Sequence, residues 1–390
     1  MSVESPTERT GRHYGTRWTA VGLFGVAAVT VFLVSQDFMA MWRDPPIYPG
    51  PGVTRQARLS DYFSGIHGTA VETDVYFLEG AEAGGTALVL GGTHPNEPAS
   101  SLTAITLVES AVVTRGRLIV IPRADHSGFT GTEPQEGYPQ FYHVATPTGT
   151  RRFRYGSRGT NAIHQWPDPI IYVNGSGQQL AGSEVRNLNR SYPGDPNGYL
   201  TERLAFAIVE LIRRERVDLA IDLHEASPEY PVINAMVAHE NAIDLAVEAA
   251  LLLEFEGIQI GVEPSPTNLR GLSHREWGDA TGTKAILIES ANPAQGRLRG
   301  RTNEALIVEG VDRYYTRAAE LGLLYVPFGA EGSPLDERVG RHLQTVSTLF
   351  EVFSSANLDR PIAVEQLPTL HDVLEHGLGA FLATPPIQLP

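Results

Sequence analysis

A histidine and a glutamate three positions apart, His94 and Glu97, follow directly after the apolar run Ala87–Leu90. Gly91 and Gly92 precede the pair and allow the backbone to turn tightly. An imidazole and a carboxylate on one turn can reach the same metal ion, and nitrogen and oxygen donors suit zinc. A His-x-x-Glu spacing arises by chance in a chain of this size. The position at a strand end therefore carries the hypothesis of a metal site.

A second histidine, His224, follows another apolar run, Leu219–Leu223. Asp222 and His224 are two positions apart, so in a strand both side chains lie on one face. A lone histidine of this kind is more often a core imidazole bonded to a carbonyl. Together with His94 and Glu97, however, it completes a set of three ligands that leaves one position open for water, as in catalytic zinc sites. We predict one Zn²⁺ per chain.

A third acidic position, Glu289, comes directly after the apolar run Lys284–Ile288. Two interpretations are open: a solvated strand end, or an acid held at the site. A hydrolytic zinc site needs a base that is not itself a ligand, to take a proton from water and deliver it to the leaving group. We predict that Glu289 fills this catalytic role.

The segment 186–190 places two arginines and two asparagines within five positions. Guanidinium groups bind carboxylates in a bidentate fork, and asparagine amides add orienting hydrogen bonds. A solvated turn before the next helix explains the same composition, so the segment alone is a candidate anion site and no more.

Composition narrows the chemistry further. The chain has 390 residues, a formal charge of -15 and no cysteine. Without cysteine there is no disulfide framework, thiolate zinc site or iron-sulfur cluster, so any metal is held by histidine and carboxylates. The acidic balance argues against a nucleic acid partner, because binding to phosphates relies on cationic contacts.

The elements that must position these residues alternate between short β-rich runs and amphipathic helices, which predicts an α/β layer fold. Continuous apolar runs such as Ala87–Leu90 indicate buried central strands. The expected strands are Val71–Leu78, Ala87–Leu90, Leu118–Ile121, Leu219–Leu223 and Lys284–Ile288. The expected helices are Ser100–Val108, capped by Ser100 or Ser101, Thr201–Arg214, Asn241–Glu254, Asn303–Leu321, Arg338–Phe353 and Leu370–His376. Between strands, residues 122–186 form a long segment with little periodicity, which is expected to be functional or to carry small local structure.

The N-terminal part contains an uncharged apolar run of 17 residues, Trp18–Val34, preceded by three arginines. We interpret it as an uncleaved membrane anchor, with the remainder outside the cytoplasm; cleavage and secretion is the alternative. A buried core helix is disfavoured because no folded part precedes it. The expected organisation is a cytoplasmic tail (1–17), an anchor (18–34), a Pro/Gly-rich linker (35–52), a zinc-hydrolase domain (53–330) and a helical C-terminal extension packed on it (331–390).

Taken in their order along the chain, the four clusters (His94 with Glu97, the segment 186–190, His224, and Glu289) resemble the zinc carboxypeptidase superfamily, specifically its aspartoacylase and succinylglutamate desuccinylase branch. The resemblance covers roughly Val71 to Pro293. It implies a mixed central β-sheet flanked by helices, one catalytic zinc, and hydrolysis of an amide bond next to a carboxylate.

The resemblance also implies a role for each site residue. The zinc ligands match His94, Glu97 and His224, and the general base and acid matches Glu289. The family's Asn-Arg pair, which would hold a substrate carboxylate, matches Asn189 and Arg190.

An upstream arginine stabilises the oxyanion in this family. The nearest is Arg186, whereas Arg154 and Arg158 lie in the long segment before it.

Three departures from the family pattern stand out. Asn187 occupies a position that usually holds aspartate, so the partner of a zinc histidine would be neutral. No tyrosine matches the mobile substrate-capping tyrosine of carboxypeptidases, and His274 or Arg275 is the alternative for that region. The helical tail does not resemble the β-rich C-terminal domain of aspartoacylases.

These observations lead to the hypothesis of a membrane-anchored zinc hydrolase that deacylates N-acyl amino acid-like substrates. Its partners would be a small acidic or peptide substrate with a carboxylate, and a lipid bilayer. A metallocarboxypeptidase or cell-wall peptide amidase is the alternative within the class. A non-catalytic binding protein and a non-haem iron oxygenase are alternatives outside it.

Overall fold

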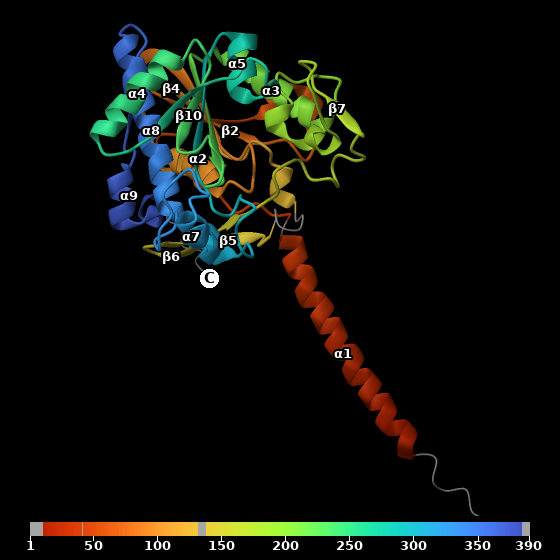
Figure 1. The fold of residues 1–390 in the computed structure, drawn as a ribbon. Coiled ribbons are helices and arrows are strands. Elements are labelled where there is room, and N and C mark those ends of the chain that lie inside the picture. The colour runs from red at the N-terminus through yellow and green to blue at the C-terminus, as the bar shows by residue number, and fades with distance from the viewer. Residues whose placement is uncertain (1–10, 41, 132–137, 384–390) are drawn as a thin grey trace, which may run out of the picture. The chain divides into compact units, whose positions relative to one another are not determined.

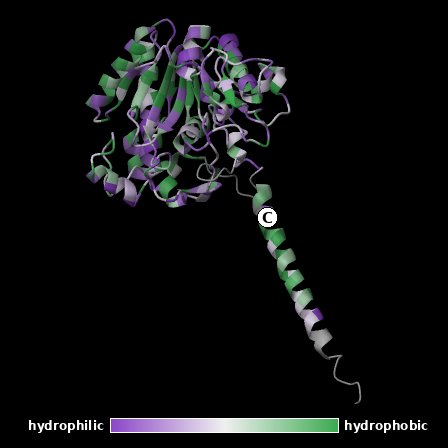
Figure 2. Cartoon of the chain, turned by 45° about the vertical axis from the view of Figure 1, so that its right-hand side comes forward, coloured by the Kyte–Doolittle hydropathy of each residue, from purple (hydrophilic) through white to green (hydrophobic). Residues whose placement is uncertain are grey.

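The computed structural model describes residues 11–40, 42–131 and 138–383. The chain divides into two compact units, Met1–Asp44 and Pro45–Pro390. The predicted cytoplasmic tail, residues 1–17, lies largely outside the described residues. The first unit contains helix α1 (Gly11–Ala40), which is mostly hydrophobic over the part coloured in Figure 2. Its part Thr16–Ala40 is 25 residues long and apolar enough to cross a membrane, a property that a signal sequence shares.

The second unit, called the body below, is built on one mixed sheet of nine strands in the described part of the chain. Along the sheet the order is β1-β2-β4-β3-β9-β12-β10-β11, and β13 also pairs with β4. The strands are β1 (Arg55–Arg58), β2 (Asp74–Glu79), β3 (Glu82–Leu90), β4 (Val112–Ile121), β9 (Leu219–Ala226), β10 (Ala235–Ala238), β11 (Gly261–Pro264), β12 (Lys284–Ala291) and β13 (Ala363–Glu365).

Helices cover both faces of this sheet, with α4 and α8 on one side and α3 and α5 on the other (Figure 1). Strand β3 is buried on both faces as a result: Ala87 and Val89 belong to one buried core, and Leu88 and Leu90 belong to the other. A strand buried on both faces has a continuous apolar sequence. The helices are α2 (Pro98–Ser110), α3 (Leu200–Glu215), α4 (Ile243–Phe255), α5 (Ser273–Thr281), α6 (Glu304–Val308), α7 (Arg313–Glu320), α8 (Leu335–Ala356) and α9 (Leu370–His376).

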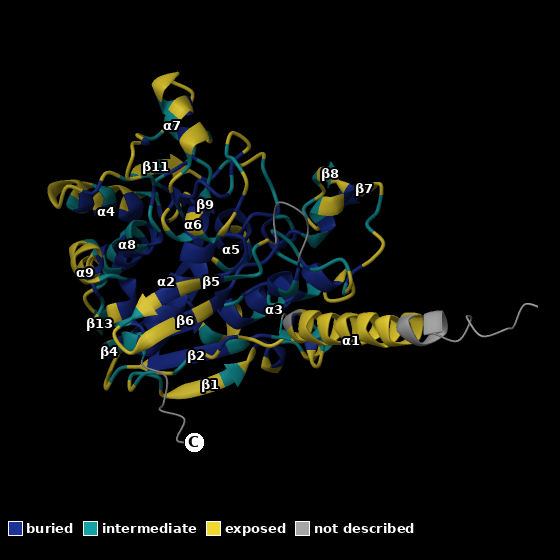
Figure 3. Cartoon of the chain, turned by 90° about the horizontal axis from the view of Figure 1, so that it is seen from below, coloured by how far each residue is buried: buried dark blue, intermediate teal, exposed yellow. Residues whose placement is uncertain are grey.

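The expected α/β fold with a mixed sheet flanked by helices is confirmed, and some local expectations are wrong. Strand β2 is buried along most of its length and not half-exposed (Figure 3), because β1 and β4 flank it and both cores cover it. Helix α2 begins at Pro98, so Ser100 and Ser101 lie inside it instead of capping it. The helix expected over 303–321 is split into α6 and α7 by Gly310, whose φ is +68°.

The long segment 122–186 carries small local structure. It contains two hairpins, one of β5 (Phe141–Thr146) with β6 (Gly149–Arg154) and one of β7 (Ile171–Val173) with β8 (Gln179–Ala181). Short 3-10 turns connect them to the body, including η4 (Gly182–Arg186) and η5 (Leu188–Arg190).

Both ends of the expected hydrolase domain extend further than the predicted boundaries. Helix α1 continues through part of the predicted linker to Ala40, and the linker residues from Pro45 onward belong to the body, where Gly50 N donates to Val108 O at 3.0 Å. Helix α8 contributes Val339, Leu343 and Val346 to the main core. The C-terminal region therefore completes the fold.

The three central strands β3, β9 and β12 are parallel neighbours. Their register places Leu90 opposite Asp222 and Glu289 opposite His224. The turn after β3 and the ends of β9 and β12 therefore meet at one edge of the sheet, where open α/β sheets bind ligands.

Candidate active site

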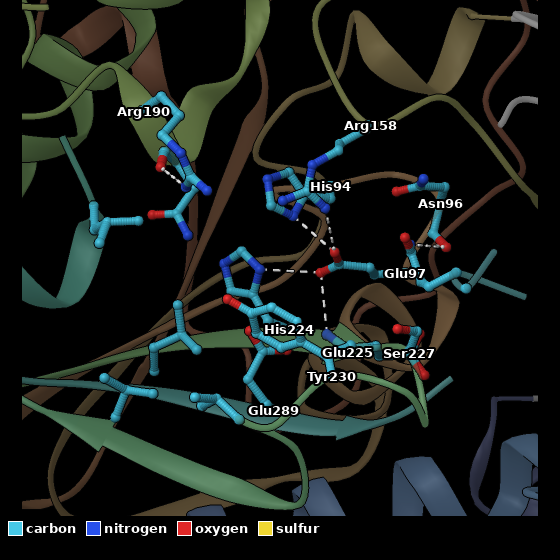
Figure 4. A pocket seen from close by; sticks show the side chains of 18 of the residues that line it. His94, Asn96, Glu97, Arg158, Arg190, His224, Glu225, Ser227, Tyr230 and Glu289 are labelled. Carbon is cyan, nitrogen blue, oxygen red and sulfur yellow. Dashed lines mark hydrogen bonds and ion pairs between the residues drawn. The ribbon is translucent and has the colours of Figure 1, made fainter. Parts of the chain in front are cut away.

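The predicted ligands His94, Glu97 and His224 form one buried group, each about 1% exposed. Their potential ligand atoms all lie within 4.8 Å of one another. The two carboxylate oxygens of Glu97 face different imidazoles: Oε1 lies 2.8 Å from His94 Nδ1, and Oε2 lies 3.0 Å from His224 Nδ1 (Figure 4). The side chains therefore meet at one point, as a shared metal ion requires.

The turn that carries His94 and Glu97 depends on Gly92, which has a φ of +70°. A Cβ at Gly92 would lie 2.9 Å from the Phe129 ring and 3.0 Å from Pro122 O, so no larger residue fits. The turn is closed by a hydrogen bond from Glu97 N to His94 O at 3.0 Å. Backbone conformation thus brings the two ligands together.

The outer nitrogen of His94, Nε2, lies 2.9 Å from Asn187 Oδ1. The orientation of this amide follows from its other contacts. Oδ1 accepts from Asn189 N at 3.0 Å, and Nδ2 donates to Glu184 Oε2 at 2.7 Å. Nε2 of His94 must therefore carry the proton, which leaves the lone pair of Nδ1 directed at Glu97. The expectation of a neutral partner for a zinc histidine agrees with this geometry.

The partner of His224 is charged. Its Nε2 lies 2.9 Å from Asp222 Oδ2, and Asp222 in turn accepts from Thr93 Oγ1 at 2.8 Å. Burial alone lowers the pKa of His224, but the negative charges of Asp222 and Glu97 outweigh it and hold the pKa well above its ordinary value. Sequence reasoning placed Asp222 on the correct face without recognising this contact.

Electrostatics at the other two ligands favour a bound cation. Burial, reinforced by the nearby charge of Arg158, lowers the pKa of His94 to about 4, so this imidazole is neutral. Burial opposes ionisation of Glu97, but the two imidazoles outweigh it and hold the Glu97 pKa well below its usual range. A carboxylate and a neutral imidazole whose lone pairs face each other at 2.8 Å suit a divalent cation such as zinc.

Glu289 lies on β12 directly beside His224 of β9. It lines the same pocket but is not part of the ligand group. Its Oε2 is buried and has no hydrogen-bond partner in the described part of the chain. Burial, together with the charge of Glu97, raises the pKa of Glu289 to about 8. The structure therefore places an acid at the site and excludes the solvated strand end.

Asn189 and Arg190 also line this pocket. Asn189 is held in place because its Oδ1 accepts from Ser273 N, the first residue of α5, at 2.8 Å. Nη1 of Arg190 donates to Asn189 O at 2.6 Å, and its Nε lies 3.9 Å from Glu184 Oε2. Burial lowers the pKa of Arg190, as expected for a guanidinium withdrawn from water.

The three candidate oxyanion arginines differ in position. Arg186 lines the pocket, but its guanidinium is bound to Asp168, with Nε 2.9 Å from Oδ1, and to Thr160 O. Arg154 is buried and donates to Phe129 O. The guanidinium of Arg158 lines the pocket, with Nη1 3.2 Å from Glu97 Oε1. The geometry favours Arg158 over Arg186 for contact with a bound carbonyl oxygen.

The cavity around these residues has a volume of about 980 Å³. Sequence reasoning missed several side chains that line it, above all Tyr230, which follows β9 and is half-exposed (Figure 4). The position of Tyr230 shortly after His224 is the one sequence feature that could have indicated a place at the site. Of the two residues suggested for the tyrosine region, His274 lines the cavity, whereas Arg275 pairs with Glu240 and Asp279 outside it. Both lie on helix α5.

No protein-family model matches the chain, and no curated protein matches it. Solved structures similar to it include a succinylglutamate desuccinylase from Silicibacter sp. TM1040, at 16% identity over 65% of this chain and 66% of that chain, with a TM-score of 0.37. A succinylglutamate desuccinylase/aspartoacylase from Rhodobacter sphaeroides is 18% identical over 67% of this chain and 62% of its own, with a TM-score of 0.36.

A metallo-carboxypeptidase from Burkholderia cenocepacia is 10% identical over 78% of this chain and 66% of its own, with a TM-score of 0.44. In all three cases the match spans less than two thirds of the other protein's length. Their names fall within the superfamily that the sequence motifs resemble.

Proposed function

We propose that this protein is a zinc-dependent hydrolase that cleaves an amide bond adjacent to a carboxylate. The observation that carries the proposal is the separation of roles within one buried site. Three ligand side chains converge on one point, and a fourth side chain, the acidic Glu289, lies beside them without joining them. A binding protein would have no use for a buried carboxylate oxygen, Oε2 of Glu289, that lacks a hydrogen-bond partner among the described residues, because such an oxygen costs folding free energy.

The ligands His94, Glu97 and His224 would hold the zinc, which supplies Lewis acidity that polarises a carbonyl and lowers the pKa of water. Glu289 takes the proton from the attacking water and gives it to the departing amine nitrogen. A pKa of about 8 for Glu289 in the metal-free site falls once a cation is bound beside it, because a nearby positive charge favours the carboxylate. Its proton affinity then suits transfer near neutral pH.

Two further groups act on the substrate. Arg190 binds the free carboxylate, and the amide of Asn189, anchored by Ser273 N, adds an orienting hydrogen bond. Arg158 stands beside Glu97 and places a positive charge where negative charge develops on the carbonyl oxygen. Arg186 positions the pocket wall through its pair with Asp168.

The substrate class that we favour is an N-acyl amino acid-like compound. A metallocarboxypeptidase or cell-wall peptide amidase is the second candidate, and the size of the cavity favours it. A volume of about 980 Å³ lies at the upper end of the range for small-molecule sites and leaves room for a short peptide.

Metal analysis of the purified chain tests the first part of the proposal. The wild type is expected to carry one zinc per chain, and His94→Ala to carry none. Glu289→Gln keeps the volume of the side chain and should retain zinc while turnover falls by roughly 10²-fold to 10⁴-fold. A wild type without stoichiometric zinc, or undiminished turnover in Glu289→Gln, would contradict the proposal.

A substrate panel tests the second part. N-acyl amino acids, short peptides and their C-terminal amides are compared with wild type and Arg190→Gln. We expect the wild type to prefer free carboxylates over amides. The variant should lose that preference because its KM for the substrates with a free carboxylate rises. If the preference survives in Arg190→Gln, another group binds the carboxylate.

We also propose that α1 anchors the body outside the cytoplasm. The support is the apolar stretch Thr16–Ala40 and the arginines that precede it, since positive residues tend to stay on the cytoplasmic side. Reporter fusions to the C-terminus, active on only one side of the membrane, test this orientation. Activity of a cytoplasmic reporter would contradict it.

A further inference from the structure

Five large apolar side chains lie exposed within 11 consecutive positions of the body. We call them the apolar rim: Ile163 (68% exposed), Trp166 (72%), Ile170 (95%), Ile171 (57%) and Val173 (53%). Single exposed apolar residues are normal on protein surfaces, whereas several of them close together in the chain point to an interaction site.

The backbone under the apolar rim is firmly held, so the exposure is not a consequence of a loose segment. The Gln165 amide donates to Val185 O at 3.0 Å, and its oxygen accepts from Thr201 N at 2.8 Å. Asp168 pairs with Arg186 at 2.9 Å. Each of these polar anchors directs its side chain into the body while the apolar residues between them remain outside.

Strand β7 shows the same division between inward and outward side chains. Tyr172 points inward, where its hydroxyl donates to Glu202 Oε1 at 2.9 Å. Ile171 and Val173, on either side of it, face outward, as alternation along a strand requires. Figure 3 shows exposed residues on this hairpin. A strand that only needed to be soluble would carry polar residues at these two outward positions.

The apolar rim adjoins the candidate active site. Trp166 and its neighbour Ala162 line the same cavity as His94 and Glu289. Whatever binds the rim therefore comes to lie next to the opening of that cavity.

Charge decides which kind of partner fits. Asp168 is the only acidic residue between Ile163 and Val173, and its charge is compensated by Arg186. The rim is thus apolar and carries no net charge. The arginines and acids before Pro45 cancel, so the chain's charge of -15 belongs to the body. Two such bodies repel each other, which disfavours a second copy as the partner.

The short connection between α1 and the body would keep the body close to a bilayer that contains α1. Only four residues separate Ala40, the end of the candidate span, from Pro45, the start of the body. Four or five extended residues reach at most about 18 Å, so a membrane-inserted α1 confines the body to the bilayer surface. At that effective concentration even a small apolar contact is occupied.

We propose that the apolar rim docks into the interface of the lipid bilayer that holds α1. Tryptophan and isoleucine side chains favour this environment, since apolar area is removed from water there and the indole N–H stays hydrated. The proposal requires α1 to be in a membrane, but it needs neither zinc nor turnover. Its failure is therefore distinguishable from failure of the proposed hydrolase function.

The absence of cysteine from the chain permits a direct test, because one introduced cysteine is the only labelling site. Ile163→Cys carries an environment-sensitive fluorophore in the full chain, reconstituted into phosphatidylcholine nanodiscs that contain lipid-attached quenchers. Leu358→Cys is the matched control, since Leu358 is also strongly exposed, at 79%. We expect quenching at position 163 to be at least several-fold stronger than at position 358.

A second variant separates docking from general proximity. Ile170→Ser with Ile171→Ser, added to the Ile163→Cys chain, should reduce the quenching without changing the thermal unfolding temperature. Equal quenching at positions 163 and 358 overturns the proposal, as does a chain that does not enter nanodiscs. A label signal that is independent of the quenchers but grows with the number of chains per disc indicates self-association, and also overturns it.

Discussion

Asn187 is the residue on which the geometry of His94 depends, because the same amide that meets His94 is held by two further contacts, from Asn189 N and to Glu184 Oε2. Its Oδ1 fixes His94 Nε2, and its Nδ2 binds Glu184 Oε2 at 2.7 Å. Asn187→Ala should lower zinc affinity by roughly 10-fold to 100-fold, the usual cost of losing such a partner. Asn187→Asp alone should not improve affinity, because the new carboxylate would face Glu184.

Chelator competition measures these affinities, and a double variant is the control. Asn187→Asp combined with Glu184→Gln removes the repulsion and should bind zinc more tightly than the wild type. Equal affinity in all these variants would mean that Asn187 does not orient His94.

Asp125 gives the body a defined pH dependence. Burial raises its pKa to about 7, although Gly128 N and Thr160 Oγ1 both donate to it. In the unfolded chain the group titrates near pH 4. Between these values the folded state holds a proton that the unfolded state has lost. Rising pH therefore removes stability, by about 4 kcal/mol in total, and the loss is complete above pH 7.

Asp125→Asn removes this titration and keeps both hydrogen bonds, since its oxygen accepts from Gly128 N and its NH₂ donates to Thr160 Oγ1. The free energy of unfolding of the variant should exceed that of the wild type increasingly between pH 4 and pH 7. Urea unfolding at several pH values measures the difference. Parallel pH profiles of the two proteins would refute a raised pKa for Asp125.

At the scale of elements, helix α8 supports the site through a buried ion pair. Arg338 Nη1 lies 2.6 Å from Glu225 Oε1, and Glu225 N donates to Glu97 Oε2 at 3.1 Å. Arg338→Met should destabilise the body by about 3–5 kcal/mol, because it leaves a buried carboxylate without its cation. Adding Glu225→Gln should recover most of that loss. A double-mutant cycle in urea measures the coupling, and additive effects would show that the pair is not coupled.

The elements also show which features a sequence can predict. Strands β3, β9 and β12 have continuous apolar sequences, and parallel strands present their carboxyl ends at one edge of the sheet. The sequence alone could therefore predict that His94 and His224 lie close together. Contacts that join distant segments have no local pattern. The pair between Arg186 and Asp168 lies in the aperiodic segment before α3, so the sequence does not show that the Arg186 guanidinium is already bound, whereas that of Arg158 lies beside Glu97.

At the scale of the whole molecule, the expected division at residue 330 does not correspond to a division of the core. The main core draws side chains from α2, α4 and α8, and β13 pairs with β4 in the central sheet. Amphipathic helices at a C-terminus have the same periodicity whether they cover a finished domain or complete it. The sequence pattern could therefore locate these helices but not assign their structural role.

Truncation separates the two possibilities. Among the described residues, both cores draw only on positions after Pro45, starting with Ile47. A chain of residues 45–390 should therefore unfold at the same temperature as the full chain in detergent and bind the same amount of zinc.

A chain that ends at residue 330 loses Leu343, Val346 and Leu349 from the core, each fully buried. Burial of one such side chain contributes about 1.5–3 kcal/mol, so losing three removes roughly 4.5–9 kcal/mol, which is comparable with the usual stability of about 5–15 kcal/mol of a protein. Circular dichroism should show no cooperative thermal transition for that chain. A folded, zinc-binding product would instead mean that the C-terminal region only covers a domain that is already complete without it.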